Sequence, residues 1–240
     1  MLRSAIDRIL ELARPIIVTA NGEEYSTVNL NKINKEMIAE PLQVSTLSSF
    51  VQYVLKFKED VKMLPYLVHV IDPTTVRLIS ALDRDRERET LIIARATTPR
   101  ITFGSFIDNE SMLIAVQSAF VDDPETDRAA ILKFAGTVTA GSIKEYGDDG
   151  VTQKAIIKTG VASVAEAIVP SPCVLRPFRT FSEVEQPESQ FIFRMKEGGG
   201  KGILSALYEA DGGAWRNVAR ANIRAYLEKE LGGTGVIVIA

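Results

Sequence analysis

Histidine and cysteine are almost absent from this chain, which contains one of each, His69 and Cys173, in 240 residues. A single cysteine cannot form an intrachain disulfide, and this is typical of proteins in a reducing cytoplasm. Thiol catalysis needs a partner base, and zinc sites usually draw on several His or Cys ligands. We therefore expect no catalytic residue, no metal site and no cofactor.

A dominant charge and a long apolar run are also missing. Lys and Arg number 28 against 31 Asp and Glu, so the net charge is −3, and no overall field attracts nucleic acid or anionic lipid. No apolar run approaches the roughly 20 residues that span a bilayer, and the first residues lack the pattern of a signal peptide. We expect a folded cytoplasmic protein with no membrane partner, in which nucleic-acid binding would need a local patch.

The hydrophobic pattern predicts an α+β fold with a mainly antiparallel sheet, built from meanders and hairpins, and four to five helices. Asn21-Gly22 and Asp72-Pro73 are typical of tight turns between strands. The expected organisation is a single α+β domain over 1–240, with two lobes at 1–104 and 105–240 as the alternative. Helices are predicted over 2–13 and 46–58, from 108, from 123, and over 214–231. Strands are predicted at 16–19, 25–30, 66–71, 76–82, 91–97, 151–158, 173–175, 191–195, 203–208 and 236–240, with a turn at 147–150.

Three local features invite a chemical interpretation. His69 alternates with apolar neighbours in a strand, which favours a half-buried structural histidine. The glycine-rich stretch 197–202 lacks the spacing of a phosphate-binding loop, so a hairpin loop is predicted. Residues 83–89 alternate in sign, and an extended backbone would give a row of arginines suited to phosphates. A solvated hairpin end is the alternative.

The last predicted helix carries Arg216, Arg220 and Arg224, one every four residues. They form a stripe beside the apolar face of that helix, which also contains Trp215. Arginine beside aromatic residues is common at protein interfaces and in nucleic-acid contacts. The alternative is a packed helix whose arginine stems extend to water.

Residues 175–194, LRPFRTFSEVEQPESQFIFR, resemble the most distinctive segment of the YfdQ-like family of phage and prophage proteins of unknown function. Residues 150–153, 158–160 and 209–215 also resemble its pattern, so the resemblance covers roughly the C-terminal half. It implies a phage-derived origin, the cytoplasm of a bacterial host cell, and neighbouring genes for phage recombination and replication. It supplies no activity and no catalytic residues.

The same segment combines arginines, acids and phenylalanines. Arg176, Arg179 and Arg194 can pair with the acids at 183, 185 and 188, which would lock a loop or a subunit contact. Held rigidly, the same arginines could bind phosphate or an acidic partner. The segment's phenylalanines are expected to anchor it to the core: Phe178, Phe181, Phe191 and Phe193.

Three functions remain open on the sequence. The first is a non-enzymatic phage accessory protein that forms a homo-oligomer, because a C-terminal strand on a glycine tether could extend a neighbour's sheet. This strand contains Val236, Ile237, Val238 and Ile239, and pairing within its own subunit is the alternative. The second is a nucleic-acid-associated factor in phage recombination or replication that uses the arginines. The third is a carboxylate-dependent hydrolase, which requires at least three acids converging in a pocket.

Overall fold

The computed structural model describes residues 2–20, 22–27, 39–57, 65–83, 86–140, 142–148, 153–159, 163–168, 171–198 and 202–240. The chain divides into two compact units, 1–38 and 39–240. It has an α+β fold with mostly antiparallel sheets, as predicted. The alternative boundary near residue 104 falls inside the larger unit.

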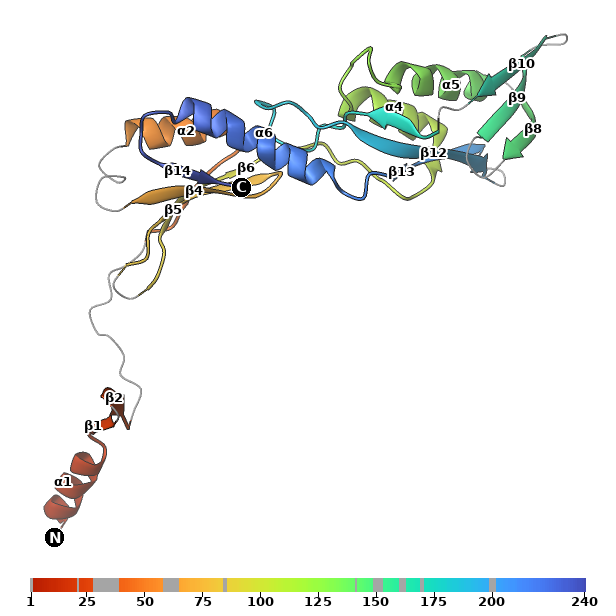
Figure 1. Ribbon diagram of the computed structural model, residues 1–240. Helices are drawn as coiled ribbons and strands as arrows, with labels where there is room; N and C mark the ends of the chain where they lie inside the picture. Colours follow the sequence, from red (N-terminus) through yellow and green to blue (C-terminus); the bar gives the residue numbers. More distant parts are fainter. Residues whose placement is uncertain are drawn as a thin grey trace. The chain divides into compact units, whose positions relative to one another are not determined.

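The N-terminal unit contains one helix and one hairpin. Helix α1 covers Leu2–Leu12, and strands β1 (Ile17–Ala20) and β2 (Glu23–Ser26) pair antiparallel (Figure 1). Gly22 sits in the turn with φ of 83°, a conformation that glycine adopts without a steric penalty. The predicted helix and hairpin are therefore confirmed, although residues 28–30 of the second predicted strand lie outside the described residues.

The larger unit contains a five-stranded sheet in the order β14-β4-β5-β6-β3. Strands β4 (Tyr66–Asp72), β5 (Thr75–Ser80) and β6 (Thr90–Arg95) form the predicted antiparallel meander. Strands β3 (Leu42–Val44) and β14 (Ile237–Ile239) flank it, and each runs parallel to its neighbour. The sheet is thus mixed rather than purely antiparallel.

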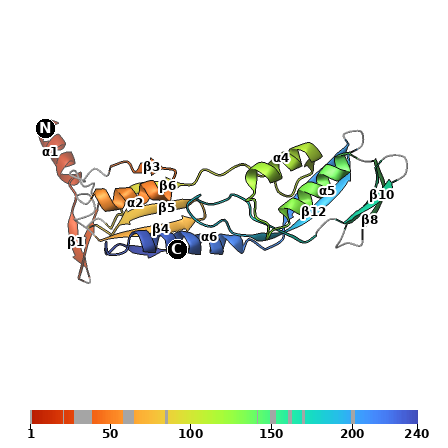
Figure 2. The ribbon, with the colours of Figure 1, turned by 90° about the horizontal axis from the view of Figure 1, so that it is seen from above.

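Helices α2 (Leu47–Lys56) and α6 (Trp215–Glu230) cover one face of this sheet (Figures 1 and 2). Thr46 caps α2, and its hydroxyl oxygen accepts the Ser49 N–H at 3.2 Å, as expected for a helix that begins after threonine. Alternate sheet residues and the apolar stripes of both helices form the first core. It includes Leu47, Phe50, Val68, Val70, Val76, Leu78, Ile92, Ile223, Leu227 and Val238.

A second core lies on the sheet β11-β12-β13-β7. Its strands are β11 (Cys173–Leu175), β12 (Ser189–Glu197), β13 (Ile203–Glu209) and β7 (Ile107–Asp108). Helices α4 (Asn109–Ala119) and α5 (Arg128–Ala140) pack on it (Figure 1). Strands β8 (Ser142–Asp148), β9 (Gln153–Thr159) and β10 (Ser163–Ile168) form a separate antiparallel sheet. The turn predicted at 147–150 extends beyond the described residues.

Two sequence predictions need correction. Helix α5 begins at Arg128 rather than after Asp123, because the Asp123 carboxylate accepts the Glu125 N–H within a turn instead of capping a helix. Phe178 does not anchor its segment, since 37% of it is exposed, whereas the other three phenylalanines are buried. The backbone holds this position instead, with the Phe178 N–H donating to the Ala119 carbonyl at 2.9 Å.

Candidate interaction surface at the C-terminal strand

Strand β14 forms one edge of the five-stranded sheet. It pairs parallel with β4, with Val238 opposite Val68, and among the described residues no strand lies on its other side. Gly233 and Gly235 have φ of 81° and 77°, and these values let the chain turn back after α6. The C-terminal strand therefore pairs within its own subunit, as the sequence alternative stated, and is not a free strand.

The side chains of β14 divide between two environments. Val238 points into the first core, whereas Ile237 and Ile239 are 66% and 43% exposed. Large aliphatic side chains at an unpaired sheet edge are unusual, because natural edge strands commonly carry charges or proline. This edge is therefore suited to contact with another protein surface.

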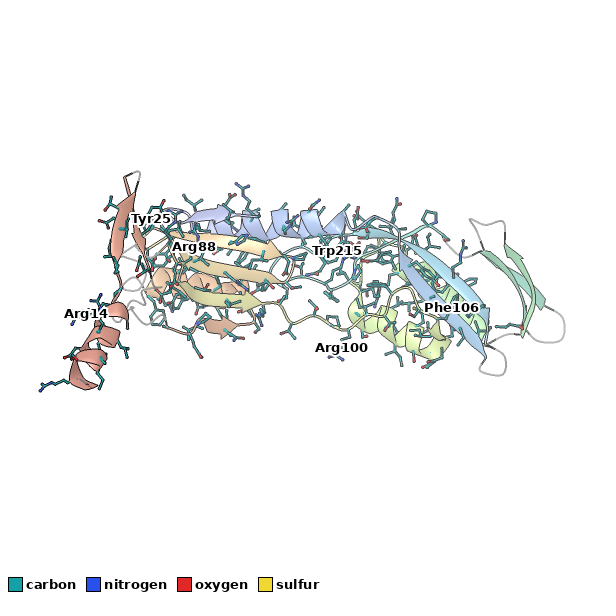
Figure 3. All side chains as sticks on the ribbon, turned by 90° about the horizontal axis from the view of Figure 1, so that it is seen from below. Arg14, Tyr25, Arg88, Arg100, Phe106 and Trp215 are labelled. Carbon is teal, nitrogen blue, oxygen red and sulfur yellow. The ribbon has the colours of Figure 1, made fainter. Side chains whose placement is uncertain are left out.

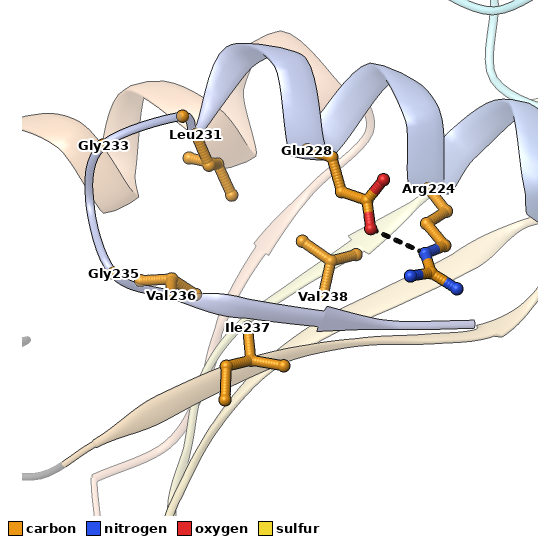
Figure 4. Close-up of a pocket in the computed structure, with 9 residues that line it drawn as sticks. Arg224, Glu228, Leu231, Gly233, Gly235, Val236, Ile237 and Val238 are labelled. Atoms are coloured by element: carbon orange, nitrogen blue, oxygen red, sulfur yellow. Dashed lines mark hydrogen bonds and ion pairs between the residues drawn. The ribbon is translucent and has the colours of Figure 1, made fainter.

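An open pocket of about 430 Å³ lies between β14 and the end of α6 (Figure 4). Arg224 and Glu228 form one wall and are joined by an ion pair of 2.7 Å. Val236, Ile237 and Val238 form the opposite wall, so the structure brings Arg224 together with the predicted C-terminal strand. Apart from Arg224 and Glu228, the lining residues are apolar or glycine.

The sheet face that turns away from α2 and α6 continues the exposed surface of β14. One row across the strands contains Ile237, Leu67 and Ile79, and the next contains Ile239, His69 and Arg77. His69 is half-buried in this row, as predicted. The half-buried Arg77 and Ile79 were not predicted from the sequence as part of this face. Their alternation with the buried Val76 and Leu78 along one strand would have indicated it.

Arg179 lies between β11 and β12 and is buried, with 7% of its surface exposed. One guanidinium nitrogen donates to Glu209 at 2.8 Å and the other to the Ser189 hydroxyl. Its guanidinium lies 3.9 Å from the ring centre of Trp215, a cation–π contact. Trp215 is labelled in Figure 3. Burial lowers the pKa of Arg179 to about 10 despite the opposing charges of Glu209 and Asp211.

Asp211 completes this network at the turn between β13 and α6. Its carboxylate accepts hydrogen bonds from the Ser189 hydroxyl at 2.7 Å and the Gly213 N–H at 2.9 Å. Burial acts to raise the pKa of Asp211, but these bonds and one from the Trp215 N–H outweigh it and lower the pKa. Asp211 is thus held as a carboxylate in a structural role.

Arg176 also pairs within the chain. It contacts the Asp123 carboxylate, and it lies 3.3 Å from Glu188 and 3.8 Å from Glu185. For Arg176 and Arg179 the structure therefore shows intrachain ion pairs that fix the loop, which was one of the two sequence alternatives. Arg194 lies apart from them, half-buried on β12 opposite Ala206.

The three arginines of α6 lie nearer the solvent. Arg216 packs 4.9 Å from the ring centre of Trp215, and Arg220 donates to the Asn217 side chain at 2.5 Å. Arg216 and Arg224 are exposed and Arg220 is half-buried. Trp215 therefore lies near both Arg179 and Arg216, but the structure gathers no cluster of all six predicted arginines.

The two loop motifs form hairpin ends. Between β5 and β6 the Arg86 N–H donates to the Asp83 carbonyl at 3.1 Å, and Arg86 has φ of 61°. The chain turns here, so an extended row of arginines is not formed by residues 83 and 86–89. Between β12 and β13 the Gly198 N–H donates to the Gly202 carbonyl at 2.7 Å, which confirms the predicted hairpin, while residues 199–201 lie outside the described part.

The hydrolase alternative, which requires at least three converging acids, stays a prediction. Among the described residues no group of three or more His, Cys, Asp or Glu side chains is placed to hold a metal. Burial, aided by the charge of Asp127, raises the pKa of Cys173 to about 12, so this thiol stays protonated at neutral pH. No helix in the described part of the chain is long and apolar enough to cross a membrane.

No family model, curated protein or solved structure matches this chain. The resemblance to the YfdQ-like family therefore stays a prediction.

Proposed function

We propose that this chain is a non-enzymatic protein that assembles into a homo-oligomer through the open edge of β14. The observation that carries the proposal is the exposure of Ile237 at an unpaired sheet edge. Two β14 strands can pair antiparallel across a two-fold axis, so that the same patch is used on both subunits. Burial of Ile237 and Ile239 would add to the backbone hydrogen bonds.

The sheet face beside β14 supports the same conclusion. Leu67 and Ile79 lie in register with Ile237, so the apolar surface extends from the edge over two further strands. Interfaces between proteins bury an apolar centre within a more polar rim, and the exposed Arg224–Glu228 pair lines the pocket on the α6 side of β14.

The proposal extends to a phage or prophage accessory role in the cytoplasm of a bacterial host. It rests there only on the resemblance of the C-terminal half, chiefly that of residues 175–194. The ion pairs of Arg176 and Arg179 are compatible with a structural role for that segment.

We expect Ile237→Lys to lower the oligomeric mass, because it places a charge at the centre of the contact. Ile114→Lys is the matched control, since Ile114 is 56% exposed on α4, the helix that packs on the second core. Sedimentation over a range of concentrations should give a wild-type mass above the 26.3 kDa of one chain. We expect Ile237→Lys to weaken association at least about tenfold, or by 1.4 kcal/mol. Identical association of the two variants would refute the role of β14.

The second candidate function is nucleic-acid association through α6. The observation in its favour is that Arg216 and Arg224 are exposed on the same helix, with Arg220 between them. Such a stripe can contact successive phosphates, and its binding would weaken steeply with salt.

The test is a binding titration with a labelled DNA duplex at several salt concentrations. Replacing Arg216, Arg220 and Arg224 together by alanine should abolish salt-sensitive binding. A variant with alanine at the exposed Arg95, Arg100 and Lys133 removes the same charge elsewhere and should keep it. Equal binding of DNA by both variants would show that α6 is not the binding site.

A further inference from the structure

The described residues of the N-terminal unit expose a large apolar surface and form no core of their own. In α1, Ile9 is 65% exposed, and Ile6 and Leu10 are exposed as well. Every residue of the unit whose burial is described is exposed. The hairpin adds further exposed apolar side chains: Ile16, Ile17, Val18 and Tyr25.

A unit of this kind cannot be stable by local structure alone. Helices shorter than about 12–15 residues are marginal in water, and α1 has 11 residues. An isolated two-stranded hairpin is equally marginal, and domains below about 40 residues usually need an additional source of stability. The apolar surface of the unit must therefore be covered for α1 and the hairpin to persist.

The face of α1 is continuous. Helical spacing places Ala5, Ile6, Ile9 and Leu10 on one side, with Ile9 near its centre. This stripe is wider than about 100°, which is typical of a helix that packs into a core. The opposite side carries only polar residues: Arg3, Ser4, Asp7, Arg8 and Glu11.

The charges of α1 favour a second copy as the occupant of this face. The described helix contains two bases and two acids, and Arg8 and Glu11 form an exposed pair at 2.9 Å. Each half of the polar side holds one base and one acid, Arg3 with Asp7 and Arg8 with Glu11. Two copies can therefore meet without net repulsion. Helices that lie on membranes typically have a polar face rich in Lys and Arg, which α1 lacks.

We propose that the apolar face of α1 packs against the same face of α1 from a second copy, and so forms a contact separate from that of β14. The hairpin of β1 and β2 extends the apolar surface beside this contact. The proposal rests on residues 2–27 and is independent of the proposed role of β14.

The test uses the full chain with Ile9→Asp, and Ser4→Asp as the matched control on the polar side of the same helix. Association is measured by sedimentation over concentration, together with helix content by circular dichroism. Ile9→Asp should weaken association at least tenfold and remove a concentration-dependent part of the helix signal. Ser4→Asp should behave as the wild-type chain. Equal association of the two variants would overturn the proposal.

Combination with Ile237→Lys separates the two contacts. If both exist, each single variant forms a smaller oligomer and the double variant is a monomer of 26.3 kDa. If Ile237→Lys weakens association and Ile9→Asp does not, the proposed α1 contact is refuted and the β14 contact stands. If Ile9→Asp weakens association and Ile237→Lys does not, the proposed β14 contact is refuted and the α1 contact stands.

Cross-linking identifies the occupant of the face. Under mild oxidation the Ile9→Cys chain should form a disulfide-linked dimer, whereas the Ser4→Cys chain should not. Absence of that dimer would overturn the proposal, because it would place the face against another part of the same chain or another partner. Flotation of the wild-type chain with phosphatidylglycerol vesicles, lost in Ile9→Asp, would overturn it in favour of a lipid surface.

Discussion

At the scale of single residues, the best-defined chemistry of this protein is structural. Arg179 is buried, and its charge is met by Glu209, by the Ser189 hydroxyl and by the ring of Trp215. Removing one member of a buried ion pair is strongly destabilising, because it leaves an unpaired charge inside the protein. The sequence predicted ion pairs for this segment. It could not identify Glu209 as the partner, since the two residues are 30 positions apart and meet only after the sheet has formed.

Asp211 should make stability depend on acid pH. The pKa of Asp211 is lower in the folded chain than in the unfolded chain. Its stabilising contribution is therefore complete above the unfolded value near 3.9 and is lost as the pH falls through the folded value. We expect Asp211→Asn to reduce the free energy of unfolding at pH 7 by about 1–3 kcal/mol. Between pH 5 and 3 the variant should lose less stability than the wild-type chain.

Urea unfolding at pH 7, 5, 4 and 3 checks this dependence. Asp122→Asn is the control. Asp122 is exposed and pairs with Arg128, and an ion pair of an exposed carboxylate contributes little to the free energy of unfolding. Parallel pH curves for Asp211→Asn and the wild-type chain would contradict the role given to this carboxylate.

At the scale of elements, local patterns predicted where helices and strands form better than they predicted which strands pair with one another. The α2 helix and the β4–β6 meander depend on capping, periodicity and turn residues that are close in sequence. The parallel pairing of β14 with β4 joins residues about 170 positions apart, and no local signal specifies it. The Asp127 carboxylate, just before α5, accepts the N–H of Val174 on β11 at 2.8 Å, a contact that no local signal specifies either.

Only part of the candidate surface was predictable from the sequence, because strand pairing has no local signal. The exposed apolar residues of the C-terminal strand were recognisable from the sequence. Their place at a sheet edge beside Leu67 and Arg224 was not, since it follows from how the strand pairs. Arg176 and Arg179 show the same limit, because the sequence predicted ion pairs with the acids at 183, 185 and 188 but not those with Asp123 and Glu209.

At the scale of the whole molecule, the two cores of residues 39–240 are not successive pieces of the chain. The first core combines Leu78 with Ile223 and Val238, which come from both sides of residue 104. The segment after β11 connects the cores, since Phe181 belongs to the first and Phe191 to the second. The Thr180 hydroxyl also donates to the Pro73 carbonyl. We therefore expect residues 39–240 to unfold cooperatively.

Deleting residues 1–38 should leave this unfolding almost unchanged, because both cores lie in 39–240. Under dilute conditions we expect the free energy of unfolding to change by less than about 1 kcal/mol. Deleting 236–240 removes Val238 from the first core and should cost about 1.5–3 kcal/mol. Denaturant titrations of the two deletions check both values. Loss of cooperative unfolding on removal of 1–38 would contradict this independence.

The lone cysteine gives the molecule an internal reporter of its own motions. Cys173 is fully buried, and its thiol donates to the Phe191 carbonyl at 3.4 Å across β11 and β12. A thiol reagent can reach this sulfur only when the second core opens around it. The rate at which the unaltered protein is labelled thus measures how often the second core opens, and no probe has to be introduced.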